Sequence, residues 1–275
     1  MVSDFILACP ACNCSSWRLE TKHLYCEPCG YSVNLTDHGI VIYSSDALIG
    51  CEEYVTRDKK AHSCLEHRKL PTQVTSISTF LSVIPDQFKN EKVLNLGCGS
   101  GPSTALLHEH GFNDVTAIDF SMERLKVNKQ GLPDDERRWF VRADLNQVDF
   151  APERCGLLMM ADFLQHLGDW QDQKHFLVKA SNALMKGGRF YLSCFNLNIK
   201  NYLRGDIHGS YSNNTIQYTR MHYKEISKLL PDNLVIDEFY PMNIFHSPVM
   251  DNLARKIPGA FLLGRMLVVT GRRTL

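Results

Sequence analysis

A predicted strand that runs straight into a glycine-rich turn constrains the fold of this chain more than any other feature. Residues 92–96 are mostly apolar, and Gly97, Gly99 and Gly101 follow at alternate positions before Pro102. Glycine lets the backbone approach a ligand closely, and proline suits the first position of a helix, where free N–H groups face that ligand. The segment therefore predicts a strand, a ligand-binding loop and a helix. A dinucleotide-binding fingerprint would need its third glycine at position 102, so Pro102 argues against NAD.

Short apolar segments alternate with helical ones beyond this loop. Such alternation is typical of an α/β fold with a Rossmann-like, doubly wound and mostly parallel sheet. Two later apolar runs, residues 235–240 and 267–271, are expected to close that sheet. The other predicted strands are residues 115–118, 139–141, 157–160 and 189–193, and the predicted helices are residues 103–110, 122–128 and 175–184, the last ended by Lys186-Gly187-Gly188.

Four more segments carry the motifs of one family in the expected order. They are residues 117–121 (AIDFS), 142–145 (RADL), 158–167 and 186–190 (KGGRF). Taken singly, the glycines suit any tight turn and the aspartates suit a helix cap or a solvated loop. Together they resemble the motifs of class I methyltransferases that depend on S-adenosylmethionine (SAM). The resemblance covers about residues 86–200 and implies a SAM site at the carboxyl ends of the strands.

The resemblance also implies roles for particular residues. Asp119 would accept hydrogen bonds from both ribose hydroxyls of SAM, and Asp144 would contact the adenine amino group. Asn95 stands where the family has an acidic residue; it offers no charge to the methionine ammonium, which costs on the order of 1 kcal/mol of SAM binding. The residues expected to contact SAM are Asn95, Gly97, Cys98, Gly99, Gly101, Asp119, Phe120, Asp144, Leu145 and Ala161.

Two Cys-x-x-Cys pairs near the N-terminus predict a metal site. Cys9 and Cys12 form the first pair, Cys26 and Cys29 form the second, and thirteen residues separate the two pairs. Each pair can form a turn whose two thiolates face one metal, and four thiolates complete a tetrahedral, structural zinc site with no open position. Residues 1–45 resemble the zinc ribbons found beside methyltransferases, including bacterial ribosomal-RNA guanine methyltransferases. Cys14 is a spare ligand candidate, and free structural cysteines are the alternative.

The segment after the fourth predicted strand is where the resemblance places the methyl group. His166 lies there and is the candidate general base, because its ordinary pKa is near neutrality; a packing role is the alternative. No Asn/Asp-Pro-Pro-aromatic tetrapeptide follows that strand, which argues against methylation of exocyclic amines on nucleobases. Residues 195–222 are rich in Asn, Tyr, His and Gly, and are expected to form the wall of the acceptor site or to pack over the sheet edge.

The bulk composition limits the class of partner and the location. Lys plus Arg and Asp plus Glu number 30 each, so the net charge of +0 argues against non-specific binding to nucleic acid. No signal peptide and no run of about 20 apolar residues is found, so we expect a cytoplasmic protein without a membrane span. The chain is expected to divide into a zinc ribbon (1–45), a helical connector (46–85) and a methyltransferase domain (86–275).

The sequence thus favours methyl transfer from SAM to a small metabolite, lipid or sugar-type acceptor. Two alternatives stay open. The zinc ribbon suits an RNA base methyltransferase that uses the ribbon to dock RNA. The second alternative is a non-catalytic module that binds SAM or a partner protein. It is favoured by Asn95, which replaces the usual acidic residue, and by the packing role open to His166.

Overall fold

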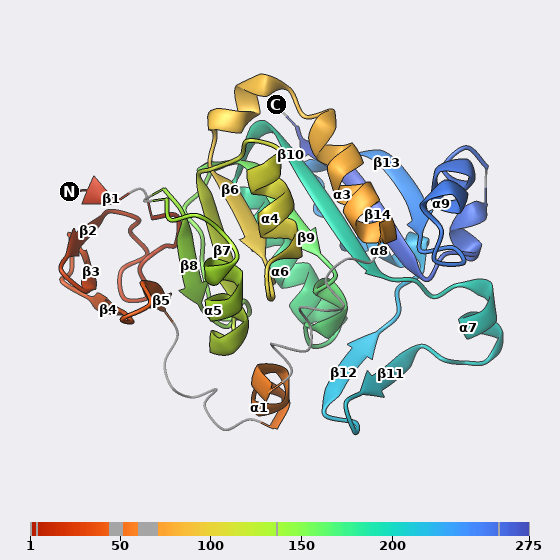
Figure 1. The fold of residues 1–275 in the computed structure, drawn as a ribbon, viewed down its shortest axis with the longest axis horizontal. Helices are drawn as coiled ribbons and strands as arrows, with labels where there is room; N and C mark the ends of the chain where they lie inside the picture. The colour runs from red at the N-terminus through yellow and green to blue at the C-terminus, as the bar shows by residue number, and fades with distance from the viewer. Residues whose placement is uncertain are drawn as a thin grey trace.

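The computed structural model describes six stretches of the chain, arranged around one continuous sheet (Figure 1). Part of the predicted connector 46–85 lies outside them. Among the described residues, no helix is both long enough and apolar enough to cross a bilayer. The described stretches are residues 2–3, 5–43, 52–59, 71–135, 137–257 and 259–274.

The centre of the sheet is parallel, as predicted. Its strand order is β8-β7-β6-β9-β10, so the chain moves outward from β6 first on one side and then on the other. In such a sheet a crevice opens where the direction of winding changes, at the carboxyl ends of the strands. These strands are β6 (Val93–Leu96), β7 (Val115–Asp119), β8 (Trp139–Arg142), β9 (Cys155–Ala161) and β10 (Leu184–Phe195).

Helices cover both faces of this sheet because its strands are apolar on both sides. Val93 and Ala117 pack with one set of helices, whereas their neighbours Leu94 and Ile118 pack with the other. The first face holds α3 (Pro71–Ser82), α4 (Pro102–Glu109) and α5 (Met122–Gln130), and the second holds α6 (Trp170–Ala183) and α8 (Tyr223–Leu229).

Two antiparallel strands close the sheet beside β10. They are β14 (Met266–Arg273), which pairs with β10, and β13 (Leu234–Met242) at the edge. Both predicted late strands are therefore present. The short helix α9 (Pro248–Ala254) and the 3₁₀ turn η4 (Ala260–Leu262) lie between them in the chain.

The N-terminal strands continue the same sheet. They form an antiparallel meander that ends in β5, and β5 pairs in parallel with β8, for example Val41 with Val141. Trp17 and Tyr43 are buried in the same apolar cluster as Val141. The ribbon therefore shares a core with the rest of the chain. Its strands are β1 (Val2–Ser3), β2 (Trp17–Glu20), β3 (His23–Cys26), β4 (Ser32–Leu35) and β5 (Ile40–Ile42).

The described part of the connector contains two helices, as its prediction as a helical segment implies. Helix α1 (Glu52–Lys59) lies beside α5, and α3 occupies most of the part that precedes Pro85. A 3₁₀ turn, η2 (Asp86–Asn90), then leads into β6. The Ser76 hydroxyl of α3 is buried and hydrogen-bonded to the hydroxyls of Tyr191 and Tyr240, at 2.9 and 3.0 Å. These bonds fix α3 on the sheet.

The end of α6 differs from the prediction. The helix stops at Ala183, and Leu184 is already extended and paired with Cys155 on β9. Gly187, expected as the helix terminus, lies within β10 at a φ of 75°, where the register of the strand shifts. Pairing of buried Leu184 with the sheet ends the helix earlier than the glycine signal indicates.

The insert after β10 forms a small unit of its own. It contains α7 (Ile199–Leu203) and the hairpin of β11 (His208–Tyr211) and β12 (Ile216–Thr219). In Figure 1 this hairpin projects from the carboxyl edge of the sheet. Strand β12 contacts η3 (Leu164–His166), the 3₁₀ turn that follows β9. The insert is the segment that was predicted either to form the acceptor wall or to pack over the sheet edge.

Candidate active site and metal centre

The glycine loop between β6 and α4 needs its glycines. All three have positive φ values, which L side chains rarely adopt: 65° for Gly97, 54° for Gly99 and 104° for Gly101. A Cβ on Gly97 would lie 2.4 Å from Cγ of Phe163, and one on Gly101 would lie 2.3 Å from the Asn128 side chain. The loop is therefore both tightly turned and closely packed.

Asp119, the last residue of β7, is held against this loop. Its Oδ2 accepts a hydrogen bond from the Gly99 N–H at 2.8 Å, and its Oδ1 accepts one from the Ser121 N–H at 2.9 Å. The side chain is only 5% exposed. Each carboxylate oxygen can accept a second hydrogen bond, so Asp119 retains acceptor capacity for a ligand.

A cleft opens beside Asp119 at the carboxyl ends of the strands; we call it the glycine-loop cleft. It brings together five of the ten residues predicted to contact SAM, namely Gly97, Asp119, Phe120, Asp144 and Leu145. The remaining residues that line it are Arg57, Arg124, Asn146, Asp162, Phe163, His166 and Leu167.

The other predicted residues lie behind the cleft. Asn95 is fully buried, and its Nδ2 donates to the hydroxyls of Ser103 at 3.1 Å and Thr104 at 3.0 Å. Its side chain therefore fixes the start of α4 and is absent from the cleft lining among the described residues. Cys98 is buried as well, while Gly99 and Gly101 shape the loop from behind. Ala161 ends β9 just before Asp162.

Sequence reasoning missed the arginines of the cleft. Arg57 comes from α1, more than sixty residues before Asp119 in the chain, and its guanidinium lies 5.3 Å from the centre of the Phe120 ring. No motif signals such a contact, because the connector carries no recognisable pattern. Arg124 lies near the start of α5, shortly after Phe120 in the chain. Its nearness in sequence to a predicted SAM contact was a signal that could have identified it.

The predicted base, His166, has partners on both ring nitrogens. Its Nδ1 lies 2.8 Å from the backbone oxygen of Gln217, and its Nε2 lies 3.3 Å from the Tyr211 hydroxyl. Burial, and to a lesser degree Arg57, lowers the pKa of His166 to about 3. The ring is therefore neutral at physiological pH and joins η3 to the insert hairpin.

Asp162 is the titratable group that the sequence reasoning passed over. It follows β9 at a φ of 57°, accepts a hydrogen bond from Nε2 of Gln73 at 2.6 Å, and accepts another from the Ser193 hydroxyl. Burial raises the pKa of Asp162 to about 6, although the Ser193 hydrogen bond opposes that rise. A carboxylate with such a pKa can take up and release a proton near neutrality.

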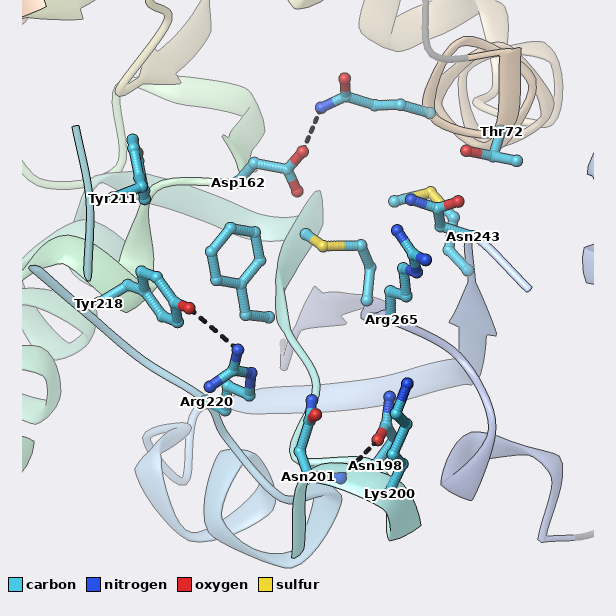
Figure 2. Close-up of a pocket in the computed structure, with 14 residues that line it drawn as sticks. Thr72, Asp162, Asn198, Lys200, Asn201, Tyr211, Tyr218, Arg220, Asn243 and Arg265 are labelled. Carbon is cyan, nitrogen blue, oxygen red and sulfur yellow. Dashed lines mark hydrogen bonds between the residues drawn. The ribbon is translucent and has the colours of Figure 1, made fainter. Parts of the chain in front are cut away.

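Asp162 also lines a second cavity, which we call the insert cavity. This cavity has a volume of about 500 Å³ and lies between α3, the insert and β14 (Figure 2). Its walls are Thr72, Gln73, Asp162, Phe195, Asn198, Lys200, Asn201, Tyr211, Tyr218, Arg220, Met242, Asn243, Arg265 and Met266.

The four predicted metal ligands converge at the N-terminal end of the sheet. The sulfur atoms of Cys9, Cys12, Cys26 and Cys29 all lie within 4.8 Å of one another. The Cys9–Cys29 and Cys12–Cys26 sulfur pairs are 3.6 and 3.5 Å apart. Zn–S bonds of about 2.3 Å in a tetrahedron place sulfur atoms roughly 3.8 Å apart, so the four side chains fit a zinc ion. Cys14 is not part of the cluster.

The fold and the glycine loop define the class of the protein. A Rossmann-like, mostly parallel sheet with a Gly-x-Gly-x-Gly loop after its central strand is the architecture of SAM-dependent methyltransferases. Residues 94–192 match the family model described as a methyltransferase domain, so this part of the chain is a methyltransferase domain. The resemblance drawn from the sequence motifs is thereby confirmed.

Individual relatives agree with this assignment. The ubiquinone biosynthesis O-methyltransferase of Idiomarina loihiensis is 27% identical over 128 residues, which cover 46% of this chain and 51% of that protein. The chain thus spans about half the length of the curated relatives it matches.

Solved structures share the fold at low identity. A methyltransferase of Haloferax volcanii, solved with the Trm112 methyltransferase activator, has a TM-score of 0.60 and 18% identity, covering 80% of this chain and 98% of that one. The 1,6-didemethyltoxoflavin-N1-methyltransferase of Burkholderia thailandensis, solved with its substrate and S-adenosylhomocysteine, has a TM-score of 0.56 and 18% identity, covering 93% of this chain and 100% of that one.

Proposed function

We propose that the chain is a SAM-dependent methyltransferase that acts on a small-molecule acceptor. One observation carries the proposal: Asp162 lines both the glycine-loop cleft and the insert cavity. A methyl donor in the cleft and an acceptor in the cavity would therefore meet at a carboxylate. Proximity of this kind contributes much of the rate in methyl transfer, because it aligns the nucleophile with the methyl group.

The glycine-loop cleft is the proposed cofactor site. SAM supplies an electrophilic methyl group on its sulfonium sulfur. Asp119 would accept hydrogen bonds from the ribose hydroxyls, and Asp144 with Leu145 would face the adenine, since all three line the cleft. Gly97 would admit the methionine part close to the backbone.

Asp162 is proposed as the proton acceptor in place of His166. The lone pair of an acceptor oxygen or nitrogen forms a bond to the methyl carbon while the carbon–sulfur bond breaks and its electron pair stays on sulfur. Asp162 takes the proton that the acceptor atom loses. Its raised pKa suits this task, whereas His166 is occupied by Gln217 and Tyr211. We assign His166 the task of holding the insert against η3.

The ribbon is proposed to hold structural zinc and to brace the cofactor cleft. Its backbone bonds to the segment after β8: the Ala8 N–H donates to the Asp149 carbonyl at 2.9 Å, and the Ala151 N–H donates to the Ile6 carbonyl at 2.8 Å. That segment carries Asp144 into the cleft. Metal in the ribbon would thus support the adenine side of the site.

The charges of the ribbon argue against RNA docking. Residues 5–43 contain two cations, Arg18 and Lys22, and three anions. Arg18 pairs with Glu20 at 2.9 Å, and Lys22 pairs with Asp37. Nucleic acid binding draws on several lysines and arginines that neutralise phosphates. The small-molecule hypothesis is therefore preferred over the RNA alternative.

The Asp119→Ala variant tests the cofactor site. Loss of the carboxylate is expected to weaken binding of S-adenosylhomocysteine (SAH) about ten- to a hundredfold, because hydrogen bonds to a charged acceptor are lost. Isothermal titration calorimetry measures the change. Asp86→Ala, an exposed aspartate whose ion pair is with Lys89, is the control and should leave the affinity unchanged. Unchanged affinity in Asp119→Ala, or tight NAD binding by the parent protein, would refute the assignment.

A further inference from the structure

The insert cavity has a carboxylate on one wall and three cations on the others. Figure 2 shows Asp162 in the upper half of the view, Arg265 to the right at mid-height, Arg220 in the lower left and Lys200 near the bottom. Arg220 is already neutralised, because its guanidinium pairs with Asp206 at 2.7 Å and contacts the Tyr218 hydroxyl at 2.9 Å. The structure therefore leaves Lys200 and Arg265 as the cations that a ligand would meet.

Lys200 and Arg265 have no counter-ion among the described residues. Within the part of the chain that the structure describes, neither side chain has an acidic or hydrogen-bonded partner. Asp206 lies on the same insert but pairs with Arg220. Both side chains are exposed on the wall of the cavity. Two unpaired cations on the wall of one cavity favour an anion, and an arginine can bind a carboxylate through two parallel hydrogen bonds.

A buried amide in the same wall has an unused acceptor. Asn243 is 8% exposed, and its side-chain oxygen has no hydrogen-bond partner among the described residues. This oxygen has almost no accessible surface, so Asn243 shapes the wall of the cavity and is assigned no hydrogen bond to the ligand. Figure 2 places Asn243 next to Arg265, where both face the cavity.

The remaining wall suits a flat molecule. Phe195 and Tyr218 stand edge to face with ring centres 5.0 Å apart, and Tyr211 is tilted by 30° from Tyr218 at 5.9 Å. Met242 and Met266 also line the cavity and add apolar surface. Aromatic rings in such arrangements accept a planar ring by stacking or edge contact.

We infer that the acceptor is a planar aromatic molecule that carries a carboxylate or a similar oxyanion on the side away from the methylated atom. Lys200 and Arg265 bind the anion, the tyrosines and methionines enclose the ring, and the hydroxyl or amine to be methylated lies toward Asp162. This inference rests on the proposed function, since it assigns the insert cavity to the acceptor. It adds the charge and shape by which the acceptor is recognised.

Matched pairs of acids and esters test the anion site. The acids 4-hydroxybenzoate, 3,4-dihydroxybenzoate and 4-aminobenzoate, in which the carboxylate lies across the ring from a hydroxyl or amine, are titrated into the SAH complex by calorimetry, each beside its neutral methyl ester. At least one acid is expected to bind about ten- to a hundredfold more tightly than its ester, as for hydrogen bonds to charged groups. In the double variant Lys200→Gln, Arg265→Gln that preference should fall to about twofold or less, with SAH affinity unchanged.

The control variant is Lys186→Gln, an exposed lysine near the start of β10, at the opposite edge of the sheet from the cavity. It should keep the full preference for acids. With SAH still bound, any one of three results would overturn the inference. The esters bind as well as the acids throughout the panel, no acid binds, or the double variant keeps the full preference for acids. Failure of the parent protein to bind SAH would instead overturn the proposed function.

Discussion

Asp162→Asn is expected to lower kcat for methyl transfer by about 10²- to 10⁴-fold, the usual contribution of a positioned general base. Asparagine has the same shape and keeps one acceptor oxygen, so it can accept one of the two hydrogen bonds that Gln73 and Ser193 donate to Asp162, but it cannot take a proton. SAH affinity should stay within about threefold, because the carboxylate is proposed to act on the acceptor. Single-turnover transfer of a radiolabelled methyl group measures the effect on chemistry.

The pH profile distinguishes a base from a structural residue. Since the pKa of Asp162 is raised to about 6, activity should be full above that pH and fall as the pH drops through it. Ser193→Ala removes a hydrogen bond that lowers the pKa of Asp162, so the loss of activity at low pH should begin at a higher pH in this variant. In Asp162→Asn the residual activity should no longer fall with pH in this range. If the fall persists in Asp162→Asn and disappears in His166→Asn, His166 is the base.

Replacing Cys26 and Cys29 together by serine is expected to abolish zinc binding and to destabilise the whole chain. Structural zinc contributes roughly 10–16 kcal/mol in isolated zinc fingers, about as much as the entire stability of an ordinary domain. The ribbon shares one apolar cluster with the sheet, so its loss would expose part of that core. The melting temperature should fall by more than about 10 °C, and SAH binding should weaken with it.

Elemental analysis and thermal unfolding check this prediction. The parent protein should hold about one zinc per chain. Cys14→Ser is the matched control, because Cys14 lies in the same ribbon outside the four-sulfur cluster, and it should retain the metal. A parent protein purified free of metal, or full metal retention in the double variant, would remove the zinc site from the account.

Local sequence signals predicted the parts of the fold that depend on local chemistry. The glycine loop, the carboxylate at the end of β7 and the four cysteines all lie where their spacing placed them. The position of each of these features depends on the geometry of a turn or on the end of a strand. A short stretch of sequence is enough to determine both. The glycine-loop cleft, the proposed cofactor site, could therefore be located in outline before the structure.

Contacts between distant segments could not be predicted in this way. Pairing of β5 with β8 joins the ribbon to the sheet, and Arg57 reaches the cleft from the connector. Asn95 turns toward α4 because two hydroxyls there satisfy its amide. We propose Asp162 in place of His166 as the base because of the burial and the partners of the two side chains, which depend on how α3 and the insert pack around β9.

A crystal structure of the SAH complex tests the central claim most directly. The account predicts that SAH occupies the glycine-loop cleft with its ribose hydroxyls on Asp119, its adenine beside Leu145 and its sulfur facing Asp162 at the opening to the insert cavity. That arrangement would place the methyl group of SAM between the glycine-loop cleft and the insert cavity. SAH bound elsewhere, or bound in the cleft with its sulfur directed away from Asp162, would contradict the account.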